Sequence, residues 1–430
     1  MPSRTAARPG TVWAVHCIDT EGPLEETLDA TFERINRVFG TALEPSLATL
    51  AQLQRGGLPL GGAESEIARF VSPSRLAYLS TWREIEEMIV RVTDPRVRQL
   101  NHDSAGRPYV FTWFVLDVVG YRDNPRRKAA GYHAVWDQYR RMIRGTSDHD
   151  GFEWHFHTVP VSGHALEYNT CWTNNDYPER VLARRLLERR AFPSVFRAGG
   201  IIERNDLSWW LEQFIPFDFS SGAMAENAGR PGRNWDWRHA PLQWKPYHPD
   251  WYDYRRTGNM RRRIFRCLEI DGYEYLLQED DVRAAFEAAA GGEDVVLAYT
   301  SHDRRDLEPG VTRAVQLLRS MQARYPGVPW RFASAAEAAR AVAGYADMTP
   351  PCFSHSWKAD VLFLESDQDL FGPIPFLALE QEGEVFFRDN PTIEGPRQWA
   401  YVLPRPRRTV RIGVAGCNVA GAVGLTVIDV

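Results

Sequence analysis

Two histidines stand two residues apart in the stretch GFEWHFHTVP, which covers residues 151–160. Side chains at positions i and i+2 of a β-strand point to the same face, so His155 and His157 would present both imidazoles to one surface. Such a pair can share a buried polar network or can bind a metal ion. The pair by itself leaves both interpretations open.

Further charged side chains stand at the ends of other apolar runs. These are Asp19 and Glu21 after TVWAVHCI, Arg197 after SVF, and His302 with Asp303 after DVVLAYTS. Because the carboxyl ends of parallel strands meet at one edge of a sheet, we expect these side chains to converge. Each also has a plain structural role open to it, such as capping a helix, pairing with a carboxylate or lying on the surface.

Together these residues make up the inventory of a hydrolytic metal site. Two histidines and a carboxylate bind a divalent ion and leave positions open for water. A second carboxylate can take a proton from that water, and a further histidine can protonate a leaving group. The combination therefore favours the metal interpretation of His155 and His157.

The elements that must position these residues alternate between strands and helices. Strands are predicted at 11–23, 108–121, 151–161, 194–200, 215–222 and 293–303. Helices are predicted at 82–92, 178–190, 205–214, 280–292, 311–325 and 334–344. Capping pairs mark two helix starts, Thr81 with Glu84 and Ser334 with Glu337. The alternation indicates parallel βαβ units covered by helices, which a barrel or a doubly wound sheet would both satisfy.

The pattern changes near residue 347. The later segments KADVLFLES, FLALEQEGEVFFRD, QWAYVLP and RTVRIGVAG predict strands separated by Pro, Gly and Asn, with no helical period. We therefore expect an α/β domain, either a barrel or a doubly wound sheet, over residues 1–347. A small all-β module resembling a sandwich should follow over residues 348–430.

Composition excludes several classes of protein. The 430 residues carry a net charge of -5, which argues against a nucleic-acid-binding protein. The five cysteines are scattered without a CxxC pair, which argues against a disulfide framework and a thiolate zinc site. The sequence begins without an apolar leader and contains no run of 18 apolar residues. We expect a cytoplasmic protein without membrane contact that acts on a small-molecule or carbohydrate substrate, and an oligomer is possible.

Two further stretches have alternative interpretations. The segment 234–254 mixes aromatic residues with Asp, His, Arg and Pro, so it would either line a ligand cleft or form a surface loop pinned by its own rings. Its candidate substrate-binding residues are Trp235, Trp237, Tyr247 and Trp251. The basic stretch YRRTGNMRRRIFR (254–266) favours a solvated face, although at the rim of a barrel it could bind a phosphate or carboxylate.

The order of these pieces resembles the NodB-type polysaccharide deacetylases, carbohydrate esterase family 4, over roughly residues 11–345. The family's first motif is a strand ending in T-F-D-D-G, and CIDTEG is similar to it with one residue between the acids. By that match Asp19 would be the catalytic base and Glu21 a metal ligand. The family's second motif, H-[ST]-x-x-H, corresponds to the H-x-H of His155 and His157, and His164 could replace His157 as the second ligand.

The later motifs match in part. FRAGG is similar to the family's R-x-P-x-G and supplies Arg197 without the Pro, and LAYTSH is similar to the strand that ends in L-x-H. The resemblance implies that His302 is the catalytic acid. It also implies an irregular (β/α)7 barrel with a divalent ion, expected to be Zn²⁺, at its mouth. The Asp-to-Glu change, the shorter His spacing, a fourth motif that is not recognisable and an insertion at about 40–110 depart from the family pattern.

Three functions remain open at this point. The leading hypothesis is a metal-dependent amidohydrolase that removes an N-acetyl group from a sugar or a sugar-containing biosynthetic intermediate. The second is the same barrel acting on a C–N bond of a non-sugar metabolite. The third is a carbohydrate-binding protein that has lost catalysis, which would bind its ligand regardless of a chelator.

Overall fold

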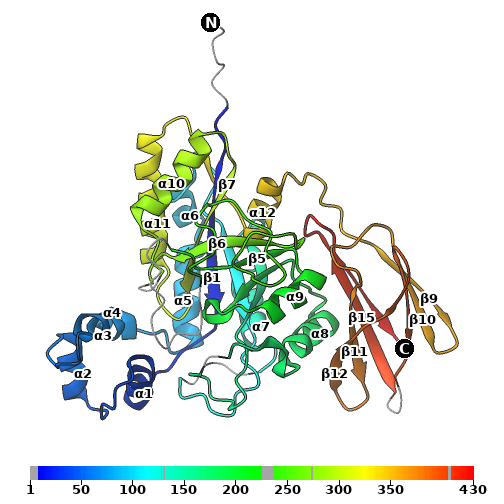
Figure 1. Cartoon of the computed structure of the whole chain (residues 1–430), viewed down its shortest axis with the longest axis horizontal. Coiled ribbons are helices and arrows are strands. Elements are labelled where there is room, and N and C mark those ends of the chain that lie inside the picture. The colour runs from blue at the N-terminus through cyan, green and yellow to red at the C-terminus, as the bar shows by residue number, and fades with distance from the viewer. Residues whose placement is uncertain are drawn as a thin grey trace, which may run out of the picture.

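A closed parallel barrel forms the centre of the protein (Figure 1). The computed structural model describes residues 8–126, 128, 131–167, 169–224, 237–272, 275–404 and 408–430. Within these residues seven strands pair in the order β2-β3-β4-β5-β6-β7-β1, and β1 returns to β2 to close the ring. They are β1 (Val12–Thr20), β2 (Phe111–Leu116), β3 (Gly151–Phe156), β4 (Val195–Ala198), β5 (Phe217–Ser221), β6 (Arg263–Glu269) and β7 (Val295–His302). The irregular (β/α)7 barrel is confirmed, and closure through β1 and β2 excludes the doubly wound sheet.

The connections between the strands carry the covering helices. They are α7 (Ala134–Met142), α8 (Tyr177–Arg189), α9 (Asn205–Phe214), α10 (Glu279–Ala290), α11 (Glu308–Arg324) and α12 (Ala335–Ala343), with short 3₁₀ turns η1 (Trp172–Asn174) and η2 (Gly199–Ile201). A short strand β8 (Trp330–Phe332) pairs with the start of β1. The Ser334 side chain accepts from the Glu337 backbone at the start of α12, so this predicted cap is confirmed.

A long helical segment separates β1 from β2. It contains α1 (Leu28–Phe39), α2 (Leu47–Gln54), α3 (Glu64–Phe70), α4 (Pro73–Leu76), α5 (Trp82–Thr93) and α6 (Pro95–Leu100). The first four enclose a small core of their own that includes Phe32, Leu53 and Phe70. Figure 1 shows this group, in blue, beyond the end of the barrel toward which β1 points. The segment therefore covers the end at which the strands' carboxyl termini lie.

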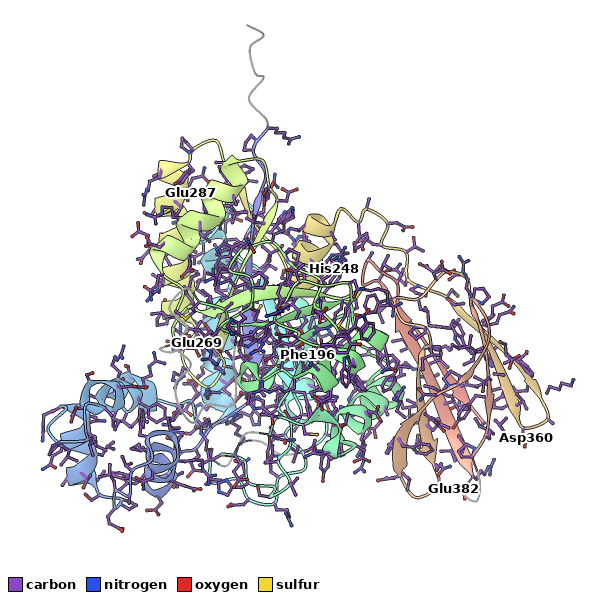
Figure 2. All side chains as sticks on the ribbon, in the orientation of Figure 1. Phe196, His248, Glu269, Glu287, Asp360 and Glu382 are labelled. Atoms are coloured by element: carbon purple, nitrogen blue, oxygen red, sulfur yellow. The ribbon has the colours of Figure 1, made fainter. Side chains whose placement is uncertain are left out.

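The predicted C-terminal all-β module is also confirmed. Two four-stranded antiparallel sheets have the orders β13-β14-β10-β9 and β12-β11-β15-β16. Their strands are β9 (Phe353–Lys358), β10 (Val361–Ser366), β11 (Phe376–Gln381), β12 (Val385–Asp389), β13 (Thr392–Gly395), β14 (Gln398–Val402), β15 (Thr409–Cys417) and β16 (Val423–Asp429). Figure 2 labels Asp360, in the turn between β9 and β10, and Glu382, in the turn between β11 and β12, both at the lower end of the module.

The module packs on helix α8 of the barrel. Leu186 and Leu187 of α8 share one apolar cluster with Phe376 of β11. A Cβ on Gly413 of β15 would lie 2.8 Å from Leu186 Cγ, so glycine permits this close approach. The contact is made on the side of the barrel rather than at its mouth, so the module supports the barrel without entering the site described below.

Strand β6 was not predicted, because its first residues belong to the basic stretch 254–266. The structure buries Arg262 completely, and its Nη1 donates to Asp218 Oδ2 at 2.6 Å. Arg266 is also buried and pairs with Asp281 at 2.7 Å. The solvated-face interpretation is therefore wrong for these two arginines, whose charges are compensated inside the fold.

Within the described ranges, none of the helices combines the length and the apolar character that a membrane crossing requires.

Candidate active site

The two faces of β1 separate the interior of the barrel from the layer under its helices. Alternate strand residues, among them Val15, Cys17 and Phe265, form one buried cluster that fills the interior. Asp19 continues the inward series of β1, and its strand register places it beside His302 of β7. His155 of β3 is likewise in register with Arg197 of β4. The predicted convergence of side chains at the carboxyl ends is thus seen at the barrel mouth.

Three potential ligand atoms converge there. Nε2 of His157 lies 3.1 Å from Nε2 of His155 and 3.1 Å from Oε1 of Glu21, and the third side of the triangle is 3.8 Å. A triangle of these dimensions contains a point about 2 Å from all three atoms, which matches zinc bonds to imidazole nitrogen and carboxylate oxygen. The donor set and its spacing therefore fit a divalent ion with open positions for water.

The two imidazoles are prepared to act as ligands. Nδ1 of His155 lies 2.9 Å from the backbone oxygen of Arg197, so its proton is held there and Nε2 is left with a free electron pair. Burial lowers the pKa of His157 to about 4, against the opposing effect of Glu21. The His157 ring is therefore expected to be neutral near pH 7, as metal ligation requires.

The second carboxylate oxygen of Glu21, Oε2, is held in place by two cations. Oε2 contacts the Lys128 ammonium and lies 2.6 Å from Nη1 of Arg304. Burial alone would raise the pKa of Glu21, but Lys128 and Arg304 hold it well below the usual range. Glu21 is thus an ionised carboxylate that directs one oxygen, Oε1, toward the histidines.

Gly199, directly after β4, makes room for His157. A Cβ at this position would lie 2.4 Å from Cγ and Cδ2 of the His157 ring, closer than real atoms approach. The two glycines of FRAGG directly follow the last residue of β4. Gly199 also creates the space in which the second imidazole sits.

A second carboxylate stands beside this cluster. Nε of Arg197 donates to both oxygens of Asp19, at 2.8 and 3.1 Å, and both side chains are buried. Nε2 of His302 lies 3.7 Å from Oδ2 of Asp19. Burial, together with the nearby Arg304, lowers the pKa of His302 well below its usual value. Asp19 and His302 thus lie side by side at the mouth, and burial leaves His302 neutral at rest.

Asp303 is not one of the three potential metal ligands, but it fixes the position of one of them. Its carboxylate accepts from the backbone nitrogens of Glu21 and Gly22, both at 2.9 Å, and from the Tyr139 hydroxyl at 2.8 Å. These bonds tie the end of β7 to the turn after β1 and so place Glu21. Asp303 was noticed at a strand end, but nothing in the sequence indicated this role.

The remaining candidates lie elsewhere. His164 pairs with Glu33 at 2.9 Å and with Asp123 at 3.1 Å, so it is not part of the ligand triangle. Trp235 lies outside the described residues. The other three aromatic candidates for substrate binding are described next.

Two of these three side chains are buried and hydrogen-bonded. Nε1 of Trp237 donates to the Ile201 backbone oxygen at 2.8 Å, and the Tyr247 hydroxyl donates to the Tyr254 backbone oxygen at 2.8 Å. Trp251 is 43% exposed. Trp237 is the one tied to the segment that follows β4, next to the mouth.

Comparisons with known proteins add little to this geometry. No family model and no curated protein matches the chain. Among solved structures it is similar to a candidate glycoside hydrolase/deacetylase from Parabacteroides distasonis, at 10% identity over 92% of this chain and 88% of the other, with a TM-score of 0.34. It is also similar to a candidate polysaccharide deacetylase from Mycobacterium smegmatis, at 11% identity over 82% and 97%, with a TM-score of 0.33. A Cellulomonas fimi endo-β-1,4-mannanase double mutant matches at 10% identity over 87% and 71%, with a TM-score of 0.18.

Superpositions this loose carry no argument about family or activity. The fold assignment therefore rests on the strand pairing, and the functional interpretation rests on the mouth residues.

Proposed function

We propose that this protein is a metal-dependent hydrolase of a C–N amide bond, and that its reaction is the N-deacetylation of a sugar or a sugar-containing intermediate. One observation carries the proposal: the ligand atoms of Glu21, His155 and His157 converge at the barrel mouth, next to the Asp19–Arg197 pair. A purely structural histidine cluster needs no second carboxylate aligned beside it. The resemblance of the motif order to the NodB-type deacetylases supports the choice of an acetamide as substrate.

Glu21, His155 and His157 would bind the ion, with zinc favoured by two nitrogen ligands and one oxygen ligand. A divalent ion bound there supplies Lewis-acid polarisation of the amide carbonyl and makes bound water easier to deprotonate. Lys128 and Arg304 keep Glu21 ionised and restrict it to one coordinating oxygen.

The protein's own groups handle the protons. Asp19 takes a proton from the attacking water, and Arg197, which donates to both Asp19 oxygens, keeps the carboxylate oriented for this task. His302 delivers a proton to the departing amine nitrogen as the C–N bond breaks. Burial keeps His302 neutral at rest, so His302 must first acquire a proton. Asp19, 3.7 Å away, can pass on the proton that it has taken from the water.

The proposal is tested by product analysis. Purified protein should release acetate from acetamido sugars and related N-acetyl compounds, chelation should abolish the release, and Zn²⁺ should restore it. Release of ammonia without acetate would assign a different C–N reaction to the barrel. Saturable sugar binding that ignores the chelator, without any hydrolysis, would favour the carbohydrate-binding alternative.

A further inference from the structure

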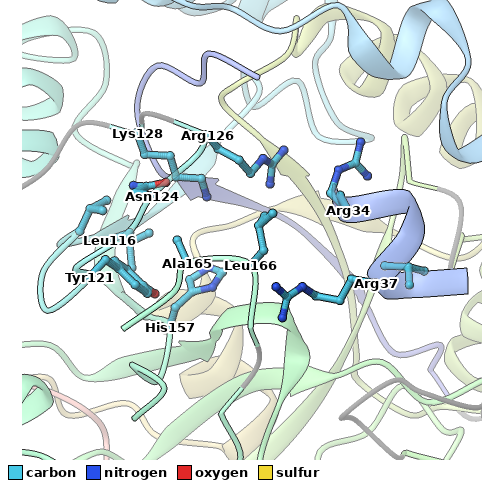
Figure 3. A pocket seen from close by; sticks show the side chains of 12 residues that line it. Arg34, Arg37, Leu116, Tyr121, Asn124, Arg126, Lys128, His157, Ala165 and Leu166 are labelled. Carbon is cyan, nitrogen blue, oxygen red and sulfur yellow. The ribbon is translucent and has the colours of Figure 1, made fainter. Parts of the chain in front are cut away.

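A cavity opens beside the ligand cluster, between α1 and the barrel mouth (Figure 3). It encloses about 660 Å³, including open solvent at its entrance. Apolar side chains from α1, from the end of β2 and from residues 165–166 form part of the wall. The polar part includes His157 and Lys128, both of which contact Glu21. Cavity and candidate active site are therefore parts of one continuous space.

Two arginines in the cavity wall share one carboxylate. Nη2 of Arg34 lies 2.8 Å from Oε1 of Glu26, and Nε of Arg126 lies 2.8 Å from Oε2 of the same residue. Glu26 is 1% exposed and is absent from the described cavity lining, so it lies behind the two guanidinium groups. One buried carboxylate thus orients two guanidinium groups at the cavity wall.

A second carboxylate that is shared by two cations lies next to the ligand cluster. Lys128 and Arg304 both pair with Glu21, again two cations on one carboxylate. Arg37, which also lines the cavity, differs because Glu33 and Glu167 lie 3.0 and 3.3 Å from it. Arg34, Arg126 and Lys128 therefore each share a carboxylate with a second cation, whereas Arg37 contacts two carboxylates.

The neighbouring Tyr78 responds to these cations. Burial would raise the pKa of its phenol, yet Arg34 and Arg126, with Arg305, lower it below the ordinary value. The guanidinium groups of Arg126 and Arg305 lie 5.4 and 5.1 Å from the Tyr78 ring centre. This region of the protein therefore stabilises an anion placed in it.

We propose that the cavity binds an anionic group of the substrate, a carboxylate or a phosphate, so that the preferred amide substrate is an anion. Guanidinium groups bind these oxyanions through charge-assisted hydrogen bonds, and a partly enclosed cavity strengthens such bonds relative to water. Because His157 belongs to both the cavity and the ligand cluster, one small molecule can reach both. The choice of substrate rests on the proposed function, whereas anion binding in the cavity does not.

Turnover of matched amides tests the preference. N-acetylglycine against N-acetylglycinamide isolates a carboxylate, and N-acetylglucosamine 6-phosphate against N-acetylglucosamine isolates a phosphate. In the native protein kcat/KM for acetate release should favour the anionic member of at least one pair by about tenfold or more. Arg126→Gln should remove most of that preference, and Arg126→Lys should restore part of it. Arg283→Gln removes a cation from α10, away from the mouth, and should leave the preference intact.

Binding of inorganic phosphate gives a readout that needs no turnover. Calorimetric titration should be done on the native protein and in the His155→Ala background, where bound metal cannot supply the anion site. Phosphate affinity should fall about tenfold with Arg126→Gln and stay unchanged with Arg283→Gln. Amide hydrolysis that ignores substrate charge, or phosphate binding that ignores Arg126, would overturn the inference and leave the proposed function standing. Arg126-dependent phosphate binding without hydrolysis of any amide would support anion binding in the cavity and overturn the proposed function.

Discussion

The two faces of β1 carry two buried polar networks that differ in chemistry. Toward the surrounding helices, Nδ1 of His16 lies 2.8 Å from the Tyr109 hydroxyl and Nε2 lies 3.0 Å from the Ser301 hydroxyl. Tyr109 also bonds Tyr299 at 2.9 Å. All members are neutral, and burial lowers the pKa of His16 to about 3. Three residues later the inward face places Asp19 against Arg197, next to the ligand cluster.

Burial is common to both networks, so burial alone does not mark a site. In the His16 network every hydrogen-bonding group of the imidazole has a protein partner, and no carboxylate takes part. In the mouth network, ligand atoms of Glu21, His155 and His157 point at one another, and a cavity opens next to them. Under the proposed function, the outer face of β1 contributes stability and the inner face carries the chemistry.

The largest predicted difference between the two faces of β1 is the loss of turnover in Asp19→Asn. The substitution keeps the shape and much of the hydrogen bonding to Arg197 but removes the base. Turnover of an N-acetyl substrate should fall roughly 10²- to 10⁴-fold while bound metal is retained. His16→Gln, on the opposite face, should leave kcat close to that of the native protein. Equal losses of kcat in the two variants would contradict the proposal that the inner face of β1, and not the outer face, carries the chemistry.

His302→Ala should separate substrates by their leaving groups. Amides, whose amine departs poorly without a proton, should lose turnover by up to roughly 10²- to 10⁴-fold. An activated acetate ester needs no such proton and should be much less affected. If ester and amide hydrolysis decline together, His302 orients or binds the substrate, and another group supplies the proton.

Gly199→Ala should weaken the metal site without touching a ligand. The added Cβ would lie 2.4 Å from the His157 ring, so the ring must move. Changes in the groups that position a ligand typically cost about 10- to 100-fold in metal affinity. Competition with a chromophoric chelator measures the loss. Gly413→Ala, which instead crowds Leu186 at the module contact, is the matched control and should retain native metal affinity.

The smallest expected effect is a pH dependence of the free energy of unfolding, which arises from His16 on the outer face of β1. His16 has a folded-state pKa of about 3, below its unfolded value near 6.5, so the unfolded chain binds a proton first on acidification. The stability that neutral His16 contributes is complete above about pH 6.5 and is lost as the pH falls toward 3. Relative to His16→Gln, the native free energy of unfolding should therefore fall by up to about 1.4 kcal/mol per pH unit in this window. Urea unfolding between pH 7.5 and 5 would show it, and a difference that stays constant with pH would contradict it.

The sequence indicated much of the inner face because a strand has a period of two. The pattern of His155 and His157 and the strand-end positions of Asp19, Arg197 and His302 were enough to bring them together once parallel strands were inferred. The barrel's closure could not be derived in this way, since it depends on the pairing of β1 with β2 across the long helical segment. β6 was missed because three consecutive arginines concealed it, and only tertiary contacts with Glu203 and Asp218 compensate the buried Arg262.

The charged surroundings of the site were also beyond sequence reasoning. Lys128 lies in a loop without a motif, and Arg34 belongs to α1, which ends just before the segment that was expected to be an insertion. Neither residue carries a local signal, because each acquires its role only when distant parts of the chain fold against the barrel mouth.

Metal content tests the central claim most directly. Native protein, His155→Ala and His16→Gln should be purified without added ions, supplied with stoichiometric Zn²⁺, dialysed, and assayed by mass spectrometry of metals. Circular dichroism should verify that each variant is folded. The native protein and His16→Gln should each retain about one ion per chain, and folded His155→Ala should retain almost none. Undiminished stoichiometric metal in His155→Ala, or a native protein that binds no ion, would contradict the assignment of Glu21, His155 and His157 as a metal site.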